Sequence, residues 1–483
     1  MIQARHEKKQ RINSAQSVEI KEELAYEYYL CESKIKRNLK KDKRTWTEAI
    51  AQKAELAAYS GNMGELYKSA RTLCNKPIAD KPLKDAAGKL QVTLEQQLCT
   101  WREHFAEVFR APTSLETTVV HSQILPDIDE DPPSISEIIK AVTTLKSGKA
   151  PGNDGITAEA LKVDVNLTGE ILEPLLTRIW EQEQVPTSWK EGIIIKLPKK
   201  GDLSQCSNWR GINLLPICSK VLCKILLSRM AKVIDSKLRE EQAGFRPGRS
   251  CADQINLLRM VLEQCQEMQC EVFTLFVDFE KAFDRVKWAS IWRVLKLNGV
   301  PDKLINIIKA LYHGSSCRVL HKGKLTESID VTAGVKQGCL LSPLLFLMVL
   351  DDVMCRVTSK GRRGLPWTSE KDLEDINFAD DLCLIATTRE QLQDKAEDLA
   401  EEAEKEGLRI NYKKTKEMRQ NTTDSTPLLI KGNQIDQVAS FCYLGSIVDQ
   451  SGGTEADIET RINKARAAFS QLKPVWNSSI LTR

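Results

Sequence analysis

Three aspartates in two distant segments are the residues of this sequence best suited to shared chemistry. Asp380 and Asp381 are adjacent within a largely apolar run, and Asp278 directly follows a second apolar run. Neighbouring carboxylates disfavour each other's charged form, so each needs a cation or another partner where water is excluded. Carboxylate oxygens suit Mg²⁺, and two such ions roughly 3.5–4 Å apart support an in-line phosphoryl transfer. The alternative is that Asp380 and Asp381 form an ordinary solvated turn or a helix cap.

Two strand patterns must position these aspartates. In residues 376–385, apolar residues flank Ala379, Asp380 and Asp381, which predicts a hairpin that turns at these three residues. Residues 272–277 are β-branched and aromatic, a composition typical of a buried central strand, and this strand would end at Asp278. If the strand and the hairpin are neighbours in one sheet, the three carboxylates can form one cage of oxygen ligands.

A basic hairpin precedes these strands in the chain. Residues 193–197 and 209–215 have strand patterns, and the turn between them contains two adjacent lysines, Lys199 and Lys200. Lys199 and Arg210 could bind a triphosphate there, because Arg offers a planar fork of donors and Lys offers a point charge. The alternative is an exposed edge hairpin that its charges protect from aggregation.

Gln337 and Gly338 lie between the two acidic segments, just before Ser342 and Pro343. Ser342 and Pro343 suit the N-cap and first turn of a helix that continues through residues 344–350. Because Gly338 has no side chain, the backbone there could lie flat against a base or sugar, which Gln337 could hydrogen-bond. A buried helix with an ordinary start would explain Ser342 and Pro343 but not the Gln-Gly pair.

The composition of the 483 residues says little about partners, because 70 basic and 66 acidic side chains leave a net charge of only +4. Local charge is more informative. Residues 34–44 contain seven Lys or Arg residues against one acid, Asp42, so a helix there would present a basic surface to a phosphate backbone. The alternative is a solvated helix face.

The cysteine pattern favours a reducing compartment. The 14 cysteines form no Cys-x-x-Cys pair and the chain has only five histidines, which argues against a zinc knuckle and against a disulfide scaffold. The first ten residues lack the apolar core of a secretory signal, and the longest nearly apolar run, residues 339–350, is too short to span a membrane. We therefore expect an intracellular protein without a membrane partner.

The ordered set of these segments resembles the reverse transcriptase domain of non-LTR (LINE-type) retrotransposons, most closely the clade with an apurinic-type endonuclease upstream. The resemblance runs from about residue 60 to the C-terminus. It rests on Gly152-Asn153-Asp154-Gly155, the hairpin of residues 196–215, Gly244-Phe245-Arg246, Val277-Asp278 through Phe283-Asp284, Gln337-Gly338 with Ser342-Pro343, Phe378-Ala379-Asp380-Asp381, and residues 407–416 and 441–445.

The resemblance implies an RNA-directed DNA polymerase with an α+β, right-hand polymerase fold. Asp278, Asp380 and Asp381 would be both catalytic residues and ligands of two Mg²⁺ ions, with Mn²⁺ as a substitute. The partners would be an RNA template, a DNA primer and deoxynucleoside triphosphates, in the nucleus, in a cytoplasmic ribonucleoprotein, or in both. The alternative is an inactive transposon remnant that binds nucleic acid.

The resemblance also implies roles for residues around the acids. Phe283 would be the gate against a ribose 2′-hydroxyl. Lys199 and Arg210 would hold the incoming triphosphate, and Gln337 with Gly338 would shape the pocket for nucleotide and template. Lys414 would be the general acid that protonates pyrophosphate, with Lys413 and Lys416 close by in the sequence. The turn of residues 443–445 resembles the grip on the primer terminus.

Five segments are expected along the chain. Residues 1–110 would be a helical, basic N-terminal extension and residues 111–133, which are irregular and contain proline and aspartate, a linker. Residues 134–272 would form the fingers and residues 273–448 the palm with the catalytic carboxylates. Residues 449–483 would begin a thumb, which we expect to be truncated, and we expect no endonuclease domain within the chain.

Overall fold

The computed structural model describes residues 2–15, 17–74, 82–110, 128–199, 201–471 and 473. They belong to two compact units, residues 1–80 with residues 458–483, and residues 81–457. Most of the predicted linker, residues 111–127, lies outside the described residues.

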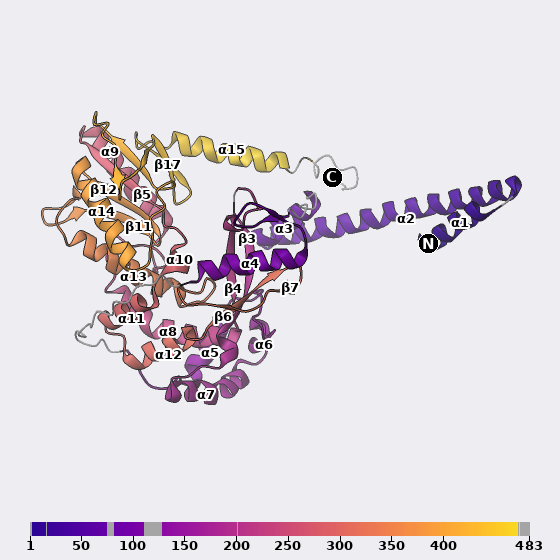
Figure 1. Ribbon diagram of the computed structural model, residues 1–483, viewed down its shortest axis with the longest axis horizontal. Helices are drawn as coiled ribbons and strands as arrows, with labels where there is room; N and C mark the ends of the chain where they lie inside the picture. The colour runs from indigo at the N-terminus through magenta and orange to yellow at the C-terminus, as the bar shows by residue number, and fades with distance from the viewer. Residues whose placement is uncertain are drawn as a thin grey trace. The chain divides into compact units, whose positions relative to one another are not determined.

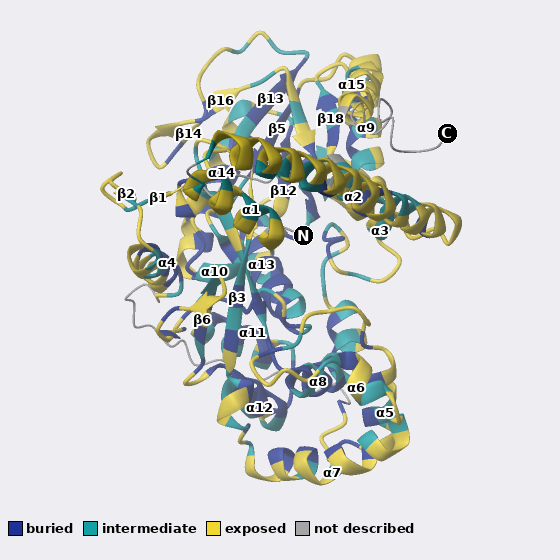
Figure 2. Ribbon diagram, turned by 90° about the vertical axis from the view of Figure 1, so that its right-hand side faces the viewer, coloured by how far each residue is buried: buried dark blue, intermediate teal, exposed yellow. Residues whose placement is uncertain are grey.

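The N-terminal part of the first unit is helical, as predicted. Its helices are α1 (Ile2–Ser14), α2 (Val18–Tyr59) and α3 (Met63–Cys74). Helix α1 folds back along α2, and an ion pair of 2.6 Å joins Lys8 to Glu27. Most of α2 is exposed, as its yellow colour in Figure 2 shows. Its surface is therefore available for contacts with another molecule.

The second unit is a mixture of helices and sheets, which confirms the predicted α+β class. Several helix starts were encoded by capping residues, such as Ser134, whose side chain accepts from the Glu137 N–H while Glu137 bonds back. The helices are α4 (Leu94–Val108), α5 (Ile135–Thr143), α6 (Ala158–Lys162), α7 (Val165–Gln182), α8 (Ile217–Asp235), α9 (Cys251–Glu267), α10 (Ala282–Arg285), α11 (Trp288–Leu297), α12 (Asp302–Tyr312), α13 (Ser342–Thr358) and α14 (Arg389–Lys405), with 3₁₀ turns at Thr187–Trp189 and Cys206–Asn208.

The central sheet of this unit has the strand order β11-β12-β5-β13-β16. Neighbouring strands are antiparallel except β13 and β16, which are parallel. The strands are β5 (Val272–Val277), β11 (Asp375–Phe378), β12 (Asp381–Ala386), β13 (Lys416–Gln420) and β16 (Asp436–Gln437). The predicted hairpin is thus β11 and β12, and the predicted central strand is β5.

Strand β5 is buried on both faces, which explains why its sequence does not alternate between apolar and polar residues. Phe273 and Leu275 pack into the core that includes α13 and α14, whereas Val272 and Phe276 pack into the core that includes α9. The sheet therefore lies between helices, a layering that Figure 1 shows for α9 and α14.

A second sheet has the order β4-β3-β6-β7, with β8 also paired to β6. Strands β3 and β4 form the predicted basic hairpin, and β6 runs parallel to β3. The strands are β3 (Glu191–Pro198), β4 (Trp209–Leu214), β6 (Ser316–His321), β7 (Lys324–Leu325) and β8 (Ile329–Asp330).

Helix α4 packs on this sheet rather than belonging to an N-terminal extension. Trp101 and Phe105 are buried in one cluster with Ile194 of β3 and Val319 of β6. The boundary between the compact units accordingly falls after residue 80 and not at the predicted residue 110. The prediction differed because the apolar face of α4 was visible in the sequence, but the sheet that covers it comes from much later residues.

Four two-stranded sheets complete the second unit, and α15 (Glu455–Gln471) crosses the boundary between the units. The strand pairs are β1 (Leu83–Lys84) with β2 (Leu90–Gln91), β9 (Leu365–Pro366) with β10 (Asp372–Leu373), β14 (Leu429–Ile430) with β15 (Asn433–Gln434), and β17 (Ser440–Tyr443) with β18 (Ser446–Asp449). In the described part of the chain, no helix is both long enough and apolar enough to cross a membrane.

Candidate active site

The turn between β11 and β12 carries the two adjacent aspartates. Phe378 pairs with Asp381 across the hairpin, so Ala379 and Asp380 form the turn itself. Ala379 is 4% exposed and has a φ of 57°, in the left-handed region that residues other than glycine rarely adopt. A tight, strained turn therefore sets the directions of Asp380 and Asp381.

Strand register brings Asp278 beside this turn. Val277 of β5 lies opposite Leu382 of β12 in an antiparallel pair. The residue after Val277 is therefore next to the residue before Leu382, which places Asp278 beside Asp381. The Asp278 N–H donates to the Thr415 hydroxyl over 3.2 Å, and its carbonyl accepts from the Asn411 N–H over 2.8 Å. The predicted meeting of the strand end and the hairpin is confirmed.

Two cavities open at these carboxylates. The Asp380 cavity, of about 510 Å³, is lined by eight of the nine predicted site residues: Lys199, Arg210, Asp278, Phe283, Gln337, Gly338, Asp380 and Lys414. The Asp381 cavity, of about 420 Å³, is lined by Asp278, Asp381, Lys413, Lys414, Tyr443 and Leu444 among others. Asp278 and Lys414 line both cavities, and Asp380 and Asp381 line one each.

The surroundings of Asp380 and Asp381 disfavour the charged forms of their carboxyl groups. Burial, and then the negative charge of Asp278, raise the pKa of Asp380. Burial, and then the charges of Asp380 and Asp278, raise the pKa of Asp381 to about 6. A bound cation would offset both effects by neutralising the local negative charge.

The donor set fits a hard divalent cation. Asp278 Oδ2 is buried without a hydrogen bond, although Lys414 Nζ lies 3.3 Å away as an ion-pair partner. Carboxylate oxygens with unfilled coordination are the ligands that Mg²⁺ prefers. Among the described residues, however, no three acidic, His or Cys side chains already stand close enough to hold a metal ion. The three acids thus have the chemistry of a metal site without forming a closed cage.

Positive charge also lines the Asp380 cavity. Lys199 follows β3 and Arg210 belongs to β4, so the two strands of one hairpin present both side chains to the cavity. Burial, and then the positive charges of Arg210 and Lys414, lower the pKa of Lys199. The three cations Lys199, Arg210 and Lys414 line one cavity, and this concentration of positive charge favours a polyanionic ligand such as a triphosphate.

Phe283 is fixed by two other aromatic rings. It stacks on Phe346 of α13 with ring centroids 4.3 Å apart. It also makes an edge-to-face contact with Phe245, in which the ring centroids are 6.4 Å apart. Such pairs hold the ring in one orientation at the cavity wall. Phe279 also lines the Asp380 cavity, but it is not part of this aromatic stack.

The Gln-Gly pair contacts protein in addition to lining the cavity. Gly338 has a φ of 115°, and a Cβ at this position would lie 2.4 Å from the Asn213 carbonyl oxygen. The missing side chain, predicted to admit a base or sugar, is therefore needed for the close approach of β4. Ser342 is also the first residue of α13 and not its N-cap, which is Leu341.

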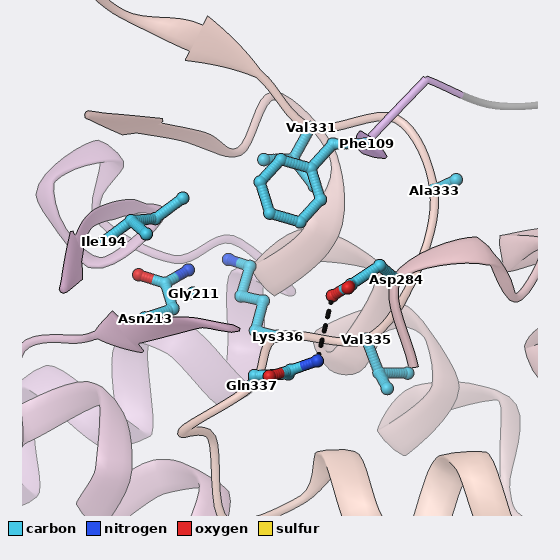
Figure 3. Close-up of a pocket in the computed structure, with 10 residues that line it drawn as sticks. All are labelled: Phe109, Ile194, Gly211, Asn213, Asp284, Val331, Ala333, Val335, Lys336 and Gln337. Carbon is cyan, nitrogen blue, oxygen red and sulfur yellow. Dashed lines mark hydrogen bonds between the residues drawn. The ribbon is translucent and has the colours of Figure 1, made fainter. Parts of the chain in front are cut away.

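Asp284 is a site residue to which the sequence interpretation gave no role. Its Oδ1 accepts from Gln337 Nε2 over 3.2 Å, as Figure 3 shows. Burial raises its pKa to about 6, although Lys281, Lys199 and Arg210 act in the opposite direction. The signal in the sequence was an acid directly after Phe283, at the end of a motif already associated with the site.

Lys336 is a second such residue. It is buried at the small cavity of Figure 3, donates to the Leu311 carbonyl over 2.8 Å and lies over the Tyr312 ring. Burial lowers its pKa to about 8. A lysine directly before Gln337 was not recognised because its burial depends on α12, which is distant in the sequence.

Comparisons with known proteins match this geometry. Residues 197–448 match the family described as reverse transcriptase (RNA-dependent DNA polymerase). The chain is 26% identical to a probable RNA-directed DNA polymerase from transposon X-element of Drosophila melanogaster over 82% of this chain and 45% of that protein.

Two further relatives come from other animals. The chain is 28% identical to a Pol polyprotein from the type-1 retrotransposable element R2 of Popillia japonica, over 64% of this chain and 44% of the relative. It is also 28% identical to a 149 kDa protein of transposon TX1 from Xenopus laevis, over 59% of this chain and 22% of the relative. The chain spans less than half the length of each of these three relatives. With three carboxylates at adjoining strand ends and a match over more than half of its residues, the chain belongs to the reverse transcriptase family, and its relatives place it with the non-LTR, LINE-type retrotransposons.

Proposed function

We propose that this chain is an RNA-directed DNA polymerase that extends a DNA primer on an RNA template. The observation that supports this most strongly is the strand register that places Asp278 beside Asp381 at the mouths of two cavities. Members of the family depend on divalent metal ions. We infer that Asp278, Asp380 and Asp381 hold two Mg²⁺ ions, or Mn²⁺ in their place.

The bound metal would activate the primer 3′-hydroxyl and neutralise charge on the transferring phosphate. The chain's own groups would do the remaining work in the Asp380 cavity. Lys199 and Arg210 bind the phosphates of the incoming nucleotide, and Phe283 excludes a 2′-hydroxyl by filling the space beside the sugar. Lys414 gives its proton to the departing pyrophosphate, which is consistent with its position at both cavities.

The Asp381 cavity is the proposed position of the primer terminus. Tyr443 and Leu444 line it together with Asp381, and the Tyr443 hydroxyl donates to the Ile376 carbonyl over 3.0 Å. This bond ties the β17–β18 turn to the catalytic hairpin. A primer held against that turn would meet a nucleotide from the Asp380 cavity at Asp278.

The segment assignments follow from this function as proposals. Residues 134–272 serve as fingers, residues 273–448 as palm and residues from 449 onward as the start of a thumb. For an enzyme that copies RNA into DNA, we propose an intracellular location in the nucleus, in a cytoplasmic ribonucleoprotein, or in both.

Primer extension on an RNA template tests the proposal. We expect extension by the wild-type chain with Mg²⁺ and deoxynucleotides, and a loss of at least about a hundredfold in Asp380→Asn, because metal ligation contributes several kcal/mol. Asp394→Asn is the matched control, since Asp394 is exposed on α14. Equal extension by wild type and Asp380→Asn would refute the proposal.

A second candidate function is nucleic-acid binding without catalysis, and the surface of α2 favours it. The seven basic side chains of residues 34–44 are all exposed, and Tyr26 and Tyr29 on the preceding turns are each 65% exposed. Their spacing places them on one half of the helix. Among the described residues, Lys34 and Lys40 have no acidic partner. Exposed cations with neighbouring aromatic rings suit single-stranded RNA.

The wild-type chain and Asp380→Asn also distinguish the two candidate functions. If the chain is a polymerase that also binds RNA through α2, Asp380→Asn keeps RNA affinity and loses extension. If it is only a binding protein, both forms bind RNA equally and neither extends a primer at any concentration of Mg²⁺ or Mn²⁺.

A further inference from the structure

A fully buried glutamine lies against the catalytic hairpin. Gln242 is 0% exposed and belongs to the segment between α8 and α9. Its backbone forms a parallel bridge with Asn377 of β11. The Ala243 N–H donates to the Asn377 carbonyl over 3.0 Å, and the Asn377 N–H donates to the Glu241 carbonyl over 3.1 Å. Residues 241–243 thus run alongside β11 up to the turn.

The side chain of Gln242 satisfies both backbone groups of Ala379. The Ala379 N–H donates to Gln242 Oε1 over 2.8 Å, and Gln242 Nε2 donates to the Ala379 carbonyl over 3.3 Å. The Gly244 N–H also donates to Gln242 Oε1, over 2.9 Å. One amide group therefore joins the loop to the residue directly before Asp380.

This contact acts on the strained residue of the turn. Ala379 has a φ of 57°, which an alanine adopts only when its surroundings impose it. Gly244 allows the loop to come this close, because a Cβ there would lie 2.2 Å from the Ala379 nitrogen. The amide of Gln242 is aligned with the peptide groups that would have to rotate if Ala379 relaxed.

The loop itself is anchored firmly enough to impose a conformation. Arg246 pairs with Asp235 at 2.8 Å and donates to the Gln242 carbonyl over 2.9 Å. Arg239 pairs with Asp351 of α13 at 3.1 Å and with the buried Asp375 of β11 at 2.9 Å. Ion pairs on both sides of Gln242 hold the segment against α8, α13 and β11.

We propose that Gln242 is a positioning residue that keeps Ala379 in its left-handed conformation and thereby fixes Asp380 and Asp381 relative to Asp278. The proposal rests on the proposed polymerase function for its kinetic consequences. Gln242 is not one of the residues that line the Asp380 cavity or the Asp381 cavity. It therefore acts through the turn and not on the substrate. None of the motifs that carry the family resemblance includes Gln242.

The proposal predicts a defect in turnover and not in nucleotide binding. If the turn relaxes, the carboxylates move while Lys199 and Arg210, on a different sheet, stay in place. A displacement of about 1 Å at a catalytic group can cost roughly a hundredfold in rate. We expect Gln242→Met to lower kcat at least tenfold and to change the KM for deoxynucleotides less than twofold.

Gln420→Met is the matched control. Gln420 is also a buried glutamine, 4% exposed, and its Nε2 donates to the Leu262 carbonyl over 3.1 Å and to Gln266 over 3.0 Å. It lies on β13 away from the turn, so its loss should reduce stability but not kcat per folded molecule. Thermal unfolding of both variants measures the folded fraction by which activity is normalised.

A second substitution tests the conformational step. Glycine adopts the left-handed region without strain. We therefore expect Ala379→Gly, introduced into Gln242→Met, to restore kcat at least threefold. The absence of any recovery would overturn the proposed action through the conformation of Ala379.

Equilibrium binding of Mn²⁺, measured by electron paramagnetic resonance, separates this proposal from the proposed function. We expect Gln242→Met to weaken Mn²⁺ binding at least fivefold and Gln420→Met to leave it unchanged. A wild-type chain that binds Mn²⁺ but extends no primer would contradict the proposed function and still test Gln242. Equal effects of the two glutamine substitutions on kcat and on Mn²⁺ binding would overturn the positioning role.

Discussion

Replacing Asp284 by asparagine should stabilise the protein at neutral pH. The Asp284 carboxyl accepts a hydrogen bond from Gln337, and an asparagine carbonyl oxygen can accept the same bond. What the substitution removes is the charge. Burial raises the pKa of Asp284 from 3.8 to about 6, which corresponds to about 3 kcal/mol. Because part of the side chain remains accessible to solvent, we expect a gain of about 1–3 kcal/mol.

The sign of the pH dependence follows from proton binding. The folded state binds the Asp284 proton more tightly than the unfolded state, so its stabilising contribution is complete below about pH 4 and is lost as the pH rises to about 6. The wild type and Asp284→Asn should therefore differ little at pH 4 and increasingly up to pH 6, with a constant difference above that. Three nearby positive charges lower the pKa of Asp284 and so partly offset burial: Lys281 from the same segment, and Lys199 and Arg210 from the β3–β4 hairpin.

Urea unfolding of both proteins between pH 4.5 and pH 8, without metal ions, measures this difference. Tryptophan emission reports mainly on the second unit, which contains Trp101, Trp180 and Trp288 in its cores. Asp394→Asn is the matched control for the loss of one exposed negative charge. A difference between wild type and Asp284→Asn that is constant over this pH range, or a variant less stable than wild type at pH 8, would refute the reasoning.

Three further predictions concern substrate contacts. Phe283→Val should admit ribonucleotides, with at least a tenfold fall in sugar discrimination, and unchanged discrimination in competition assays would contradict the gate assignment. Lys414→Ala should lower kcat by roughly 10²–10⁴-fold with a shifted pH–rate profile, whereas Lys413→Ala, which changes a residue of the Asp381 cavity alone, should not. Reversing four charges on α2 should reduce the slope of log affinity against log salt for single-stranded RNA by about 3, since each phosphate contact contributes roughly 0.7; filter binding measures this slope, and an unchanged slope would exclude α2 from the RNA contact. These four residues are Lys34, Arg37, Lys41 and Arg44.

The catalytic strands could be predicted from the sequence because local patterns determine them. A β-branched and aromatic run that ends at Asp278, and a hairpin with acids at its turn, are each patterns of one short segment of the chain. The same holds for the β3–β4 hairpin that carries Lys199 and Arg210. The resemblance to a known family then supplied the order of these segments.

Contacts between distant segments could not be predicted. Asp284 and Gln337 are hydrogen-bonded although they are 53 positions apart in the sequence, and Gln242 and Ala379 are hydrogen-bonded over 137 positions. The sequence around these four residues does not indicate which residue each will contact. Gly338 shows the same limit, because a glycine beside a ligand and a glycine beside Asn213 look alike in one sequence. Only the folded structure shows which neighbouring group leaves no room for a side chain at Gly338.

The distribution of the three acids over two cavities explains why the site needs residues from two separate segments. Asp380 lies in the turn and Asp381 is the first residue of β12, and the two side chains line different cavities. Asp278, at the end of the adjacent strand, lines both cavities and can serve a group held in either one. A third acid one residue earlier on β5 would replace Val277, which is buried in the core with α13 and α14, on the face opposite to Asp278 and Asp381. The two-sided site therefore depends on the end of β5 falling at Asp278, and this position is set by the apolar residues that bury the strand.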